Sequence, residues 1–283
     1  MEVFHLRNKA FPDPVQIIRN ILELRAMTNE WRRENLSIGF VPTMGNLHAG
    51  HLQLVEESRV RADRTVVSIF VNPMQFGETE DFDGYPKTTD EDCAALTEKE
   101  VDVVFMPEVE EIYPGGLQQT TRIEVTSLSD IVEGSFRPGH FQGVATVVAK
   151  LLNMVQPDVA LFGEKDFQQL LVIRQMVQDL NMPVQIIGIP TVREPDGLAM
   201  SSRNGYLTDE ERKLAPEIYR TLQNVQGQLN QGGRDFQILE QQAEKDLNKK
   251  GFKTDYLMIR RAEDLLYPTA DDHKLVILVA SWL

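Results

Sequence analysis

The chain has 283 residues, of which 42% are hydrophobic and 25% are charged, and this composition is ordinary for a soluble globular protein. Its formal net charge of −14 argues against a general nucleic-acid binder, because affinity for a phosphate backbone needs a basic surface. The single cysteine, Cys93, allows no intrachain disulfide, and no apolar run approaches the roughly 20 residues that a membrane helix needs.

Strand-like and helical segments alternate along the first two thirds of the chain. Residues 65–71 (T-V-V-S-I-F-V) are apolar almost throughout, as in a strand that is covered on both faces. We expect strands at residues 37–41, 65–71, 101–106, 158–162 and 184–189. We expect helices at residues 15–33, 51–64, 144–155 and 167–180. This alternation predicts a parallel sheet covered by helices, which is the doubly wound α/β fold.

The pattern changes after residue 189. A polar connection with two prolines and two glycines covers residues 190–205. The run T-D-E-E at residues 208–211 is typical of a capping box and predicts a long helix that ends near Gly232. A second helix and two strands are expected after it, at residues 239–247, 256–259 and 275–280. We therefore predict a Rossmann-like domain at residues 1–189 and a smaller α+β domain at residues 190–283.

Two of the five histidines lie in P-T-M-G-N-L-H-A-G-H (residues 42–51), between an expected strand and an expected helix. Ligands of a doubly wound sheet bind beyond the carboxyl ends of its strands, and this stretch lies at such an end. Glycines let the backbone approach a ligand, a helix N-terminus attracts phosphate, and imidazoles donate hydrogen bonds to phosphate oxygens. The position favours phosphate binding over the alternative that the two histidines have no shared function. It also favours phosphate binding over a metal site, because no further metal ligands accompany the two histidines at a suitable spacing.

H-A-G-H in this place resembles the H-x-G-H signature of the nucleotidyltransferase superfamily. M-S-S-R-N (residues 200–204) stands where that superfamily has a second, Lys/Ser-rich loop, although alone it also fits a polar turn. Five motifs together resemble the pantoate–β-alanine ligase family in order and spacing, over nearly the whole chain. They are P-T-M-G-N-L-H-A-G-H, S-I-F-V-N-P-M-Q-F, E-G-S-F-R-P-G-H-F-Q-G-V, F-G-E-K-D-F-Q-Q and D-G-L-A-M-S-S-R-N.

Members of this family join pantoate to β-alanine with ATP and Mg²⁺, through a pantoyl-adenylate, and release AMP and pyrophosphate. The resemblance therefore implies a ligase of coenzyme A precursor biosynthesis with small-molecule partners. It implies a catalytic set of His48, His51, Lys165, Ser201, Ser202 and Arg203. It implies an ATP site made of Met44, Gly45, Asn46, Leu47, His48, Ala49, Gly50, His51, Gly163, Glu164, Lys165, Asp166, Val192, Met200, Ser201, Ser202 and Arg203.

The resemblance also assigns residues to pantoate and to the metal. Gln75 and Gln169 match the pantoate glutamines of the family, and an amide suits a substrate with hydroxyls and a carboxylate, while the alternative for either is a solvated surface residue. Arg137 would reach the same site, although an ion pair elsewhere is an open alternative. Glu91 and Asp92 match acidic positions near Mg²⁺, and their alternative role is to stabilise the start of a helix. Asp166 would hold a ribose hydroxyl or cap the helix that follows.

Two other functions compete with the ligase. A nucleotidyltransferase that transfers AMP to a phosphorylated alcohol and stops there would use the same H-A-G-H loop. An RNA-binding relative of a synthetase is disfavoured by the charge of −14. The glutamine pair and the S-S-R run favour the ligase.

Further expectations concern assembly and location. The resemblance implies a homodimer and a smaller domain that closes over ATP as a lid. The N-terminal run M-E-V-F-H-L-R lacks the basic and apolar regions of a secretion signal, and with the single cysteine this fits a cytoplasmic protein. Family members usually continue past the position of Leu283 with a short tail, and every motif named above precedes that position.

Overall fold

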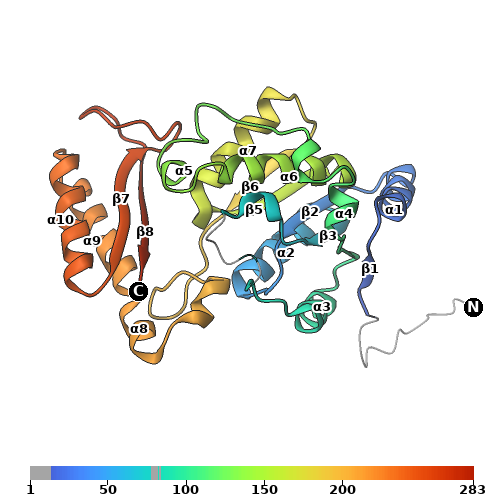
Figure 1. The fold of residues 1–283 in the computed structure, drawn as a ribbon, viewed down its shortest axis with the longest axis horizontal. Helices are drawn as coiled ribbons and strands as arrows, with labels where there is room; N and C mark the ends of the chain where they lie inside the picture. Colours follow the sequence, from blue (N-terminus) through green and yellow to red (C-terminus); the bar gives the residue numbers. More distant parts are fainter. Residues whose placement is uncertain (1–13, 78–81, 83) are drawn as a thin grey trace, which may run out of the picture.

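The fold is built on two separate sheets (Figure 1). The computed structural model describes residues 14–77, 82 and 84–283, so the expectation about a secretion signal lies outside the described residues. The larger sheet has six strands in the order β1-β4-β3-β2-β5-β6, and all its pairings are parallel. The smaller sheet pairs β7 with β8 in antiparallel fashion. The predicted α/β fold with a parallel sheet and a smaller C-terminal part is confirmed.

Buried apolar residues form the central strands of the large sheet. Its strands are β1 (Gln16–Ile18), β2 (Ile38–Thr43), β3 (Arg64–Ile69), β4 (Val103–Phe105), β5 (Val159–Gly163) and β6 (Gln185–Ile189). Phe40 of β2 lies opposite Val66 of β3 on one side and Ala160 of β5 on the other, and all three are fully buried. Helices cover both faces of the central strands β2 and β3, which are therefore almost fully buried, whereas the edge strands β1 and β6 stay partly exposed.

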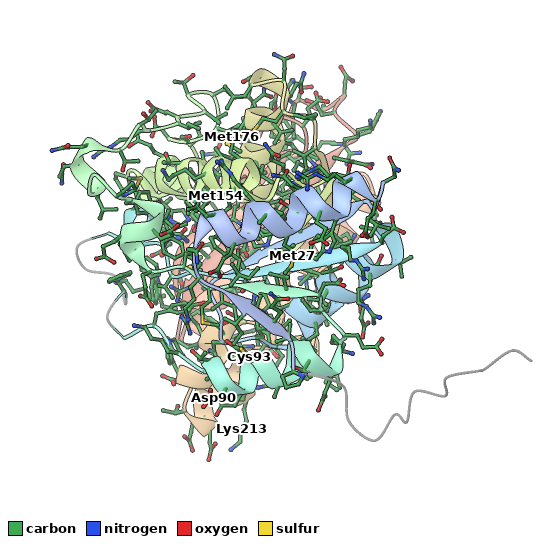
Figure 2. The ribbon with its side chains drawn as sticks, turned by 90° about the vertical axis from the view of Figure 1, so that its right-hand side faces the viewer. Met27, Asp90, Cys93, Met154, Met176 and Lys213 are labelled. Carbon is green, nitrogen blue, oxygen red and sulfur yellow. The ribbon has the colours of Figure 1, made fainter. Side chains whose placement is uncertain are left out.

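Helices cover the large sheet on two sides. One side carries α1 (Ile21–Arg33), α6 (His140–Val155) and α7 (Phe167–Asp179), and the other carries α2 (Ala49–Arg61) and α3 (Thr89–Glu98). Figure 2 shows Met27, Met154 and Met176 on the first side and Cys93 of α3 on the second. Two shorter helices are α4 (Val109–Ile112) and α5 (Glu133–Phe136). Among the described residues, no helix is both long enough and apolar enough to cross a membrane.

The strand order reverses beside β2. From β2 the chain runs outward through β3 to β4, and it later returns to place β5 and β6 on the opposite side of β2. The loops that leave β2 and β5 therefore diverge over opposite faces of the sheet. Such a reversal opens a crevice at the carboxyl ends of the two strands, which is where ligands bind in this type of sheet.

The expected helix at residues 15–33 is wrong in its first turn. Gln16–Ile18 form the edge strand β1, which pairs with β4, and the helix begins only at Ile21. Asn20 explains the boundary, because its side chain accepts a hydrogen bond from the N–H of Glu23 and caps the helix there.

The long helix expected after residue 208 is divided in two. Its capping box is confirmed, since Thr208 accepts from the N–H of Glu211 and the Glu211 carboxylate accepts from the N–H of Thr208. The chain then forms α8 (Asp209–Leu214) and α9 (Glu217–Asn230). Pro216 lies between them, and a proline has no N–H to continue a helix.

The smaller sheet has two different apolar faces. It is formed by β7 (Lys253–Arg261) and β8 (Leu275–Trp282), and it follows α10 (Phe236–Lys249). Leu257 and Ile259 belong to a cluster with α9 and α10, whereas Tyr256 belongs to the cluster of the large sheet. This alternation follows from the two-residue period of a strand. The division of the chain into domains at residue 189 stays a prediction.

Candidate active site

The loop between β2 and α2 is held by a carboxylate from another helix. Asp92 of α3, which is 3% exposed, accepts hydrogen bonds from the N–H of Asn46 through Oδ2 and from the N–H of Leu47 through Oδ1, both at 2.8 Å. The hydroxyl of Thr88 donates to the same carboxylate. Gly45, at φ +82°, makes the left-handed turn that brings these amides to Asp92. The loop therefore has a fixed shape before any ligand arrives.

His48 and His51 form a capping box at the start of α2, which begins at Ala49. His48 Nδ1 accepts from the N–H of Gly50 at 3.1 Å, and His51 Nδ1 accepts from the N–H of His48 at 3.3 Å. Their ring centroids lie 4.0 Å apart. A nitrogen that accepts from an amide carries no proton, so each neutral ring must hold its proton on Nε2. Both histidines are thus fixed as Nε2–H donors.

The environment keeps both imidazoles neutral. Burial, and then the charge of Lys165, lower the pKa of His48, and Asp166 opposes them in part. Burial, and then the neighbouring His48, lower the pKa of His51 to about 3. Near pH 7 the pair therefore provides two N–H donors and no added positive charge.

This shift of His51 predicts how stability depends on pH. The unfolded chain binds a proton at His51 near its ordinary pKa of 6.5, whereas the native state does so only near 3, so the free energy of unfolding falls as the pH drops below 6.5. At pH 5 the expected loss is about 2 kcal/mol. Glutamine at this position keeps a capping box, so His51→Gln should lack this part of the pH dependence. Urea unfolding of both proteins at pH 7 and pH 5 measures the difference, and parallel curves would contradict the expectation.

A lysine and an aspartate follow β5, across the crevice from the histidines. Lys165 Nζ lies 3.2 Å from Asp166 Oδ1, and the two side chains keep 39% and 61% of their exposure. Asp166 raises the pKa of Lys165, and Lys165 lowers the pKa of Asp166, so both stay charged. Asp166 makes no capping hydrogen bond to α7, which removes the alternative role expected for it. Both charges act on the pKa of His51, so the lysine and the aspartate lie within electrostatic range of the histidine pair.

The other residues of the predicted G-E-K-D segment differ in their surroundings. The position where a Cβ of Gly163 would lie is open to at least 4 Å. The carboxylate of Glu164 lies beside Gly188 of β6, with Oε1 3.1 Å from where a Cβ of Gly188 would be. Of this segment, Lys165 and Asp166 are therefore the charged groups that reach the histidine pair.

The S-S-R segment docks on the β2 loop. The hydroxyl of Ser202 donates to the Asn46 carbonyl at 3.0 Å, and the Asn46 amide donates to the Ser202 carbonyl at 3.3 Å. Ser201 caps the short helix η4 (Ser202–Tyr206) by accepting from the N–H of Arg203. The charge of Arg203 acts on Lys165. Two segments separated by 156 residues therefore meet at the site.

Residues just before that segment complete the contact. A Cβ added at Gly50 would lie 3.8 Å from the Cβ of Met200, so Met200 flanks the start of α2. The N–H of Met200 donates to the carbonyl of Val192. The Val192 carbonyl therefore already accepts one hydrogen bond from the chain, and the assignment of this residue to the ATP site stays a prediction.

The two predicted pantoate glutamines are held differently. Gln75 ends the short helix η1 (Pro73–Gln75), and its side chain bonds to Asn72 and to the sulfur of Met44. Its backbone carbonyl accepts from Nδ1 of the buried His140 at 2.8 Å. The amide of Gln169 makes no hydrogen bond to any residue of the described part of the chain, whereas its buried neighbour Gln168 anchors residues 128–133.

Arg137 forms an ion pair, which was the alternative to its predicted role in substrate binding. Its guanidinium contacts Glu133 at 2.9 Å and donates to His140 Nε2 at 3.1 Å. Because an arginine N–H only donates, His140 must carry its proton on Nδ1, where it faces the Gln75 carbonyl. Arg137 therefore supports the glutamine through His140.

The two acidic residues predicted near Mg²⁺ do not form a metal site by themselves. Both oxygens of Asp92 are occupied by loop amides, and Glu91 is exposed on α3. Among the described residues, no group of three or more His, Cys, Asp and Glu side chains could hold a metal ion. Metal ligation by Glu91 and Asp92 stays a prediction, and these contacts count against it.

Sequence reasoning missed the residues that support the site. Asn72, Tyr113 and His140 all lie behind Gln75, and Asp92 was assigned to metal rather than to the loop. One signal was available, because Asn followed by Pro in N-P-M-Q is typical of a capped helix start. Cys93 packs against the apolar cluster between the sheet and α3, and burial raises the pKa of its thiol, which disfavours the reactive thiolate.

The arrangement suits chemistry at a phosphate group. Two fixed N–H donors, the N-terminus of α2, and the cations Lys165 and Arg203 converge where negative charge can be bound. Gln75, whose side chain contacts the sulfur of Met44 in the β2 loop, lies beside this place, and its amide suits a polar substrate with hydroxyl or carboxylate oxygens.

Comparison with known proteins gives the same family over nearly the whole chain. The family model of pantoate-beta-alanine ligase matches residues 16–283. The pantothenate synthetase of Alkalilimnicola ehrlichii is 55% identical over 266 residues, which are 94% of this chain and 93% of that protein. The pantothenate synthetase of Pseudomonas fluorescens is also 55% identical over 266 residues, with the same coverage.

Solved structures agree with these sequence matches. A crystal structure of pantothenate synthetase from Thermus thermophilus superimposes with a TM-score of 0.87 at 47% identity, and covers 95% of each chain. A pantoate-beta-alanine ligase from Francisella tularensis, complexed with beta-gamma ATP and beta-alanine, gives a TM-score of 0.78 at 35% identity, over 95% of this chain and 97% of that one. With this fold, these motifs and these relatives, the chain belongs to the pantoate–β-alanine ligase family.

Proposed function

We infer that the protein joins pantoate to β-alanine at the expense of ATP, through a pantoyl-adenylate, with release of AMP and pyrophosphate. The observation that carries this inference is the pair of Nε2–H donors on His48 and His51 at the start of α2, facing Lys165 across the crevice. The name of the family and the Francisella tularensis complex with beta-gamma ATP and beta-alanine support the same substrates.

The first step needs positive potential and hydrogen-bond donors rather than a nucleophile from the protein. The carboxylate oxygen of pantoate attacks the α-phosphorus of ATP, a new O–P bond forms, and the bond to pyrophosphate breaks. His48 and His51 donate to oxygens at the α-phosphorus, where charge grows in the transition state. Lys165 and Arg203 hold the leaving pyrophosphate, and Ser201 and Ser202 place Arg203 by fixing its loop.

The second step uses the same positions. The neutral amine of β-alanine attacks the activated carbonyl, a C–N bond forms, and the C–O bond to AMP breaks as the nitrogen gives up a proton. Gln75 and Gln169 hold pantoate in both steps, so that the carbonyl stays beside the incoming amine. A Mg²⁺ carried by the ATP phosphates would neutralise their charge, and of the two carboxylates predicted near it, Glu91 is the one whose oxygens are not taken up by the amides of the β2 loop.

The remaining proposals concern the setting of the enzyme. We propose a homodimer, a cytoplasmic location and closure of residues 190–283 over ATP, as the family resemblance implies. The contact between Ser202 and Asn46 supports the last of these, because it already joins the two parts of the chain at the nucleotide loop. Sedimentation equilibrium would test the dimer, and a monomer at all concentrations would contradict it.

A product assay tests the reaction itself. The protein is incubated with ATP, Mg²⁺ and pantoate, with and without β-alanine, and the products are separated. We expect pantothenate, AMP and pyrophosphate when all substrates are present. A stable adenylylated product that ignores β-alanine would instead support the alternative nucleotidyltransferase, and ADP would contradict both.

A further inference from the structure

The side chain of Gln75 is held from behind by two buried residues that the reaction above does not use. Asn72 is 1% exposed and Tyr113 is 2% exposed. The hydroxyl of Tyr113 lies 2.7 Å from Asn72 Oδ1, and Asn72 Nδ2 lies 3.1 Å from Gln75 Oε1. These contacts form a chain from the interior of the protein to the substrate glutamine.

Main-chain partners fix which end of the Asn72 amide is which. The N–H of Met74 faces one end at 3.3 Å, and an N–H can only donate, so that end is the oxygen. The carbonyl of Gly143 faces the other end at 3.2 Å, and a carbonyl can only accept, so that end is the NH₂ group. A flipped Asn72 would lose both contacts.

The orientation of Asn72 passes to Gln75. Because the Asn72 NH₂ group faces Gln75, the atom it meets must be the oxygen Oε1. The Gln75 NH₂ group then points the other way, 3.3 Å from the sulfur of Met44 in the nucleotide loop. The end of Gln75 that faces the reacting groups can donate hydrogen bonds and cannot accept them.

We propose that Tyr113, acting through Asn72, is a positioning residue that fixes Gln75 as a hydrogen-bond donor to the substrate. This proposal rests on the proposed function, in which Gln75 binds pantoate. Tyr113 must donate, because the atom it meets is the Asn72 oxygen. Burial raises the pKa of Tyr113 above its usual range, so the phenol keeps the proton it donates.

The proposal restricts the atom of pantoate that meets Gln75. It must be an acceptor, such as a carboxylate oxygen or a hydroxyl lone pair. An isosteric acid at position 75 would accept from Asn72 with one oxygen and present a second acceptor to the substrate. It would therefore repel the atom that glutamine attracts, although its shape is unchanged.

The first test is the variant Gln75→Glu. Near pH 8 we expect kcat/KM for pantoate to fall by about 100-fold, with the Kd of ATP changed by less than about twofold. Activity relative to the wild type should recover as the pH falls toward 5, because a protonated glutamate can donate. The control Gln75→Met removes the donor without adding a charge and should show a loss with no recovery in acid. A Gln75→Glu variant that keeps wild-type kcat/KM near pH 8 would overturn the proposal.

The second test separates positioning from a structural effect of Tyr113. Tyr113→Phe removes only the hydroxyl, and it should raise KM for pantoate about fivefold with little change in kcat. In the Gln75→Met background the same substitution should change KM by less than about twofold, because its only route to the substrate is gone. An equal effect in both backgrounds, or none in either, would overturn the role of Tyr113.

The wild type in the same assay distinguishes a failure of the Gln75 donor assignment from a failure of the proposed function. If the wild type makes pantothenate and the variants behave like it, the donor assignment fails and the proposed function stands. If the wild type does not turn over pantoate, the proposed function fails and this inference fails with it.

Discussion

Replacing His48 by asparagine should slow adenylate formation by about 10²- to 10³-fold, while the protein stays folded. The two nitrogens of His48 do different work. Nδ1 caps α2 by accepting from the N–H of Gly50, and Nε2 carries the proton that is donated toward the phosphate. Asparagine is among the best N-cap residues, so its side-chain oxygen keeps the first role and loses the second.

The alanine variant separates the two roles. His48→Ala removes the cap as well, and we expect it to lower the free energy of unfolding by about 1 kcal/mol compared with His48→Asn. Both variants should lose adenylate formation to a similar degree. Pyrophosphate release from ATP and pantoate measures the rate, and urea unfolding measures the stability. Wild-type rates in His48→Asn would show that the imidazole does not touch the reacting phosphate.

Adding one methyl group at Gly143 should both destabilise the protein and impair pantoate binding. A Cβ at this position of α6 would lie 2.4 Å from the Met74 carbonyl oxygen and 2.7 Å from the Gln75 Cα. These are backbone atoms, so η1 and the glutamine it carries must move. We expect Gly143→Ala to lower the free energy of unfolding by about 1–3 kcal/mol. A shift of Gln75 by even 1 Å would reduce kcat/KM for pantoate by about 10²-fold.

A second helical glycine provides the matched control. A Cβ added at Gly227 of α9 would meet no heavy atom within 4 Å. Gly227→Ala should therefore raise the stability by about 0.5–1 kcal/mol, as in other helix interiors, and leave the activity unchanged. The same Gly→Ala change is therefore expected to lower the free energy of unfolding at position 143 and to raise it at position 227. Equal stability of both variants would show that α6 and η1 do not approach as closely as described.

Local patterns were sufficient to predict which loops come together at the carboxyl edge of the sheet. The apolar run before P-T-M-G-N-L-H-A-G-H and the helical spacing after it predict a strand, a loop and a helix without reference to the rest of the chain. The same holds for F-G-E-K-D, which spans the end of β5 and the short helix η3 (Glu164–Asp166) after it. Two such loops at the carboxyl ends of parallel strands must share one edge of the sheet, so the meeting of His51 and Lys165 could be expected.

Long-range contacts were not visible in the same patterns. Asp92 lies 46 residues from Asn46, and Tyr113 lies 41 residues from Asn72. Neither contact produces a hydrophobic period or a turn motif in the sequence. Asp92 was therefore assigned to metal, and Tyr113 received no role. The strand β1 was missed for a related reason, because three residues are too few to distinguish a strand period from a helix period.

The place of β2 in the middle of the sheet has a consequence for synthesis of the chain. Its partner β3 follows within a few dozen residues, but β5 does not. Asp158, the residue just before β5, lies 120 residues beyond Ile38, and its carboxylate accepts a hydrogen bond from the N–H of Ile38. A ribosome that adds about 5–20 residues per second needs roughly 6–24 s to cover that distance. During that time the nascent chain carries an open apolar strand edge of the kind that pairs with other chains. Chaperone binding to ribosome-bound intermediates should therefore end when β5 emerges, and this can be followed by arresting synthesis before and after that strand.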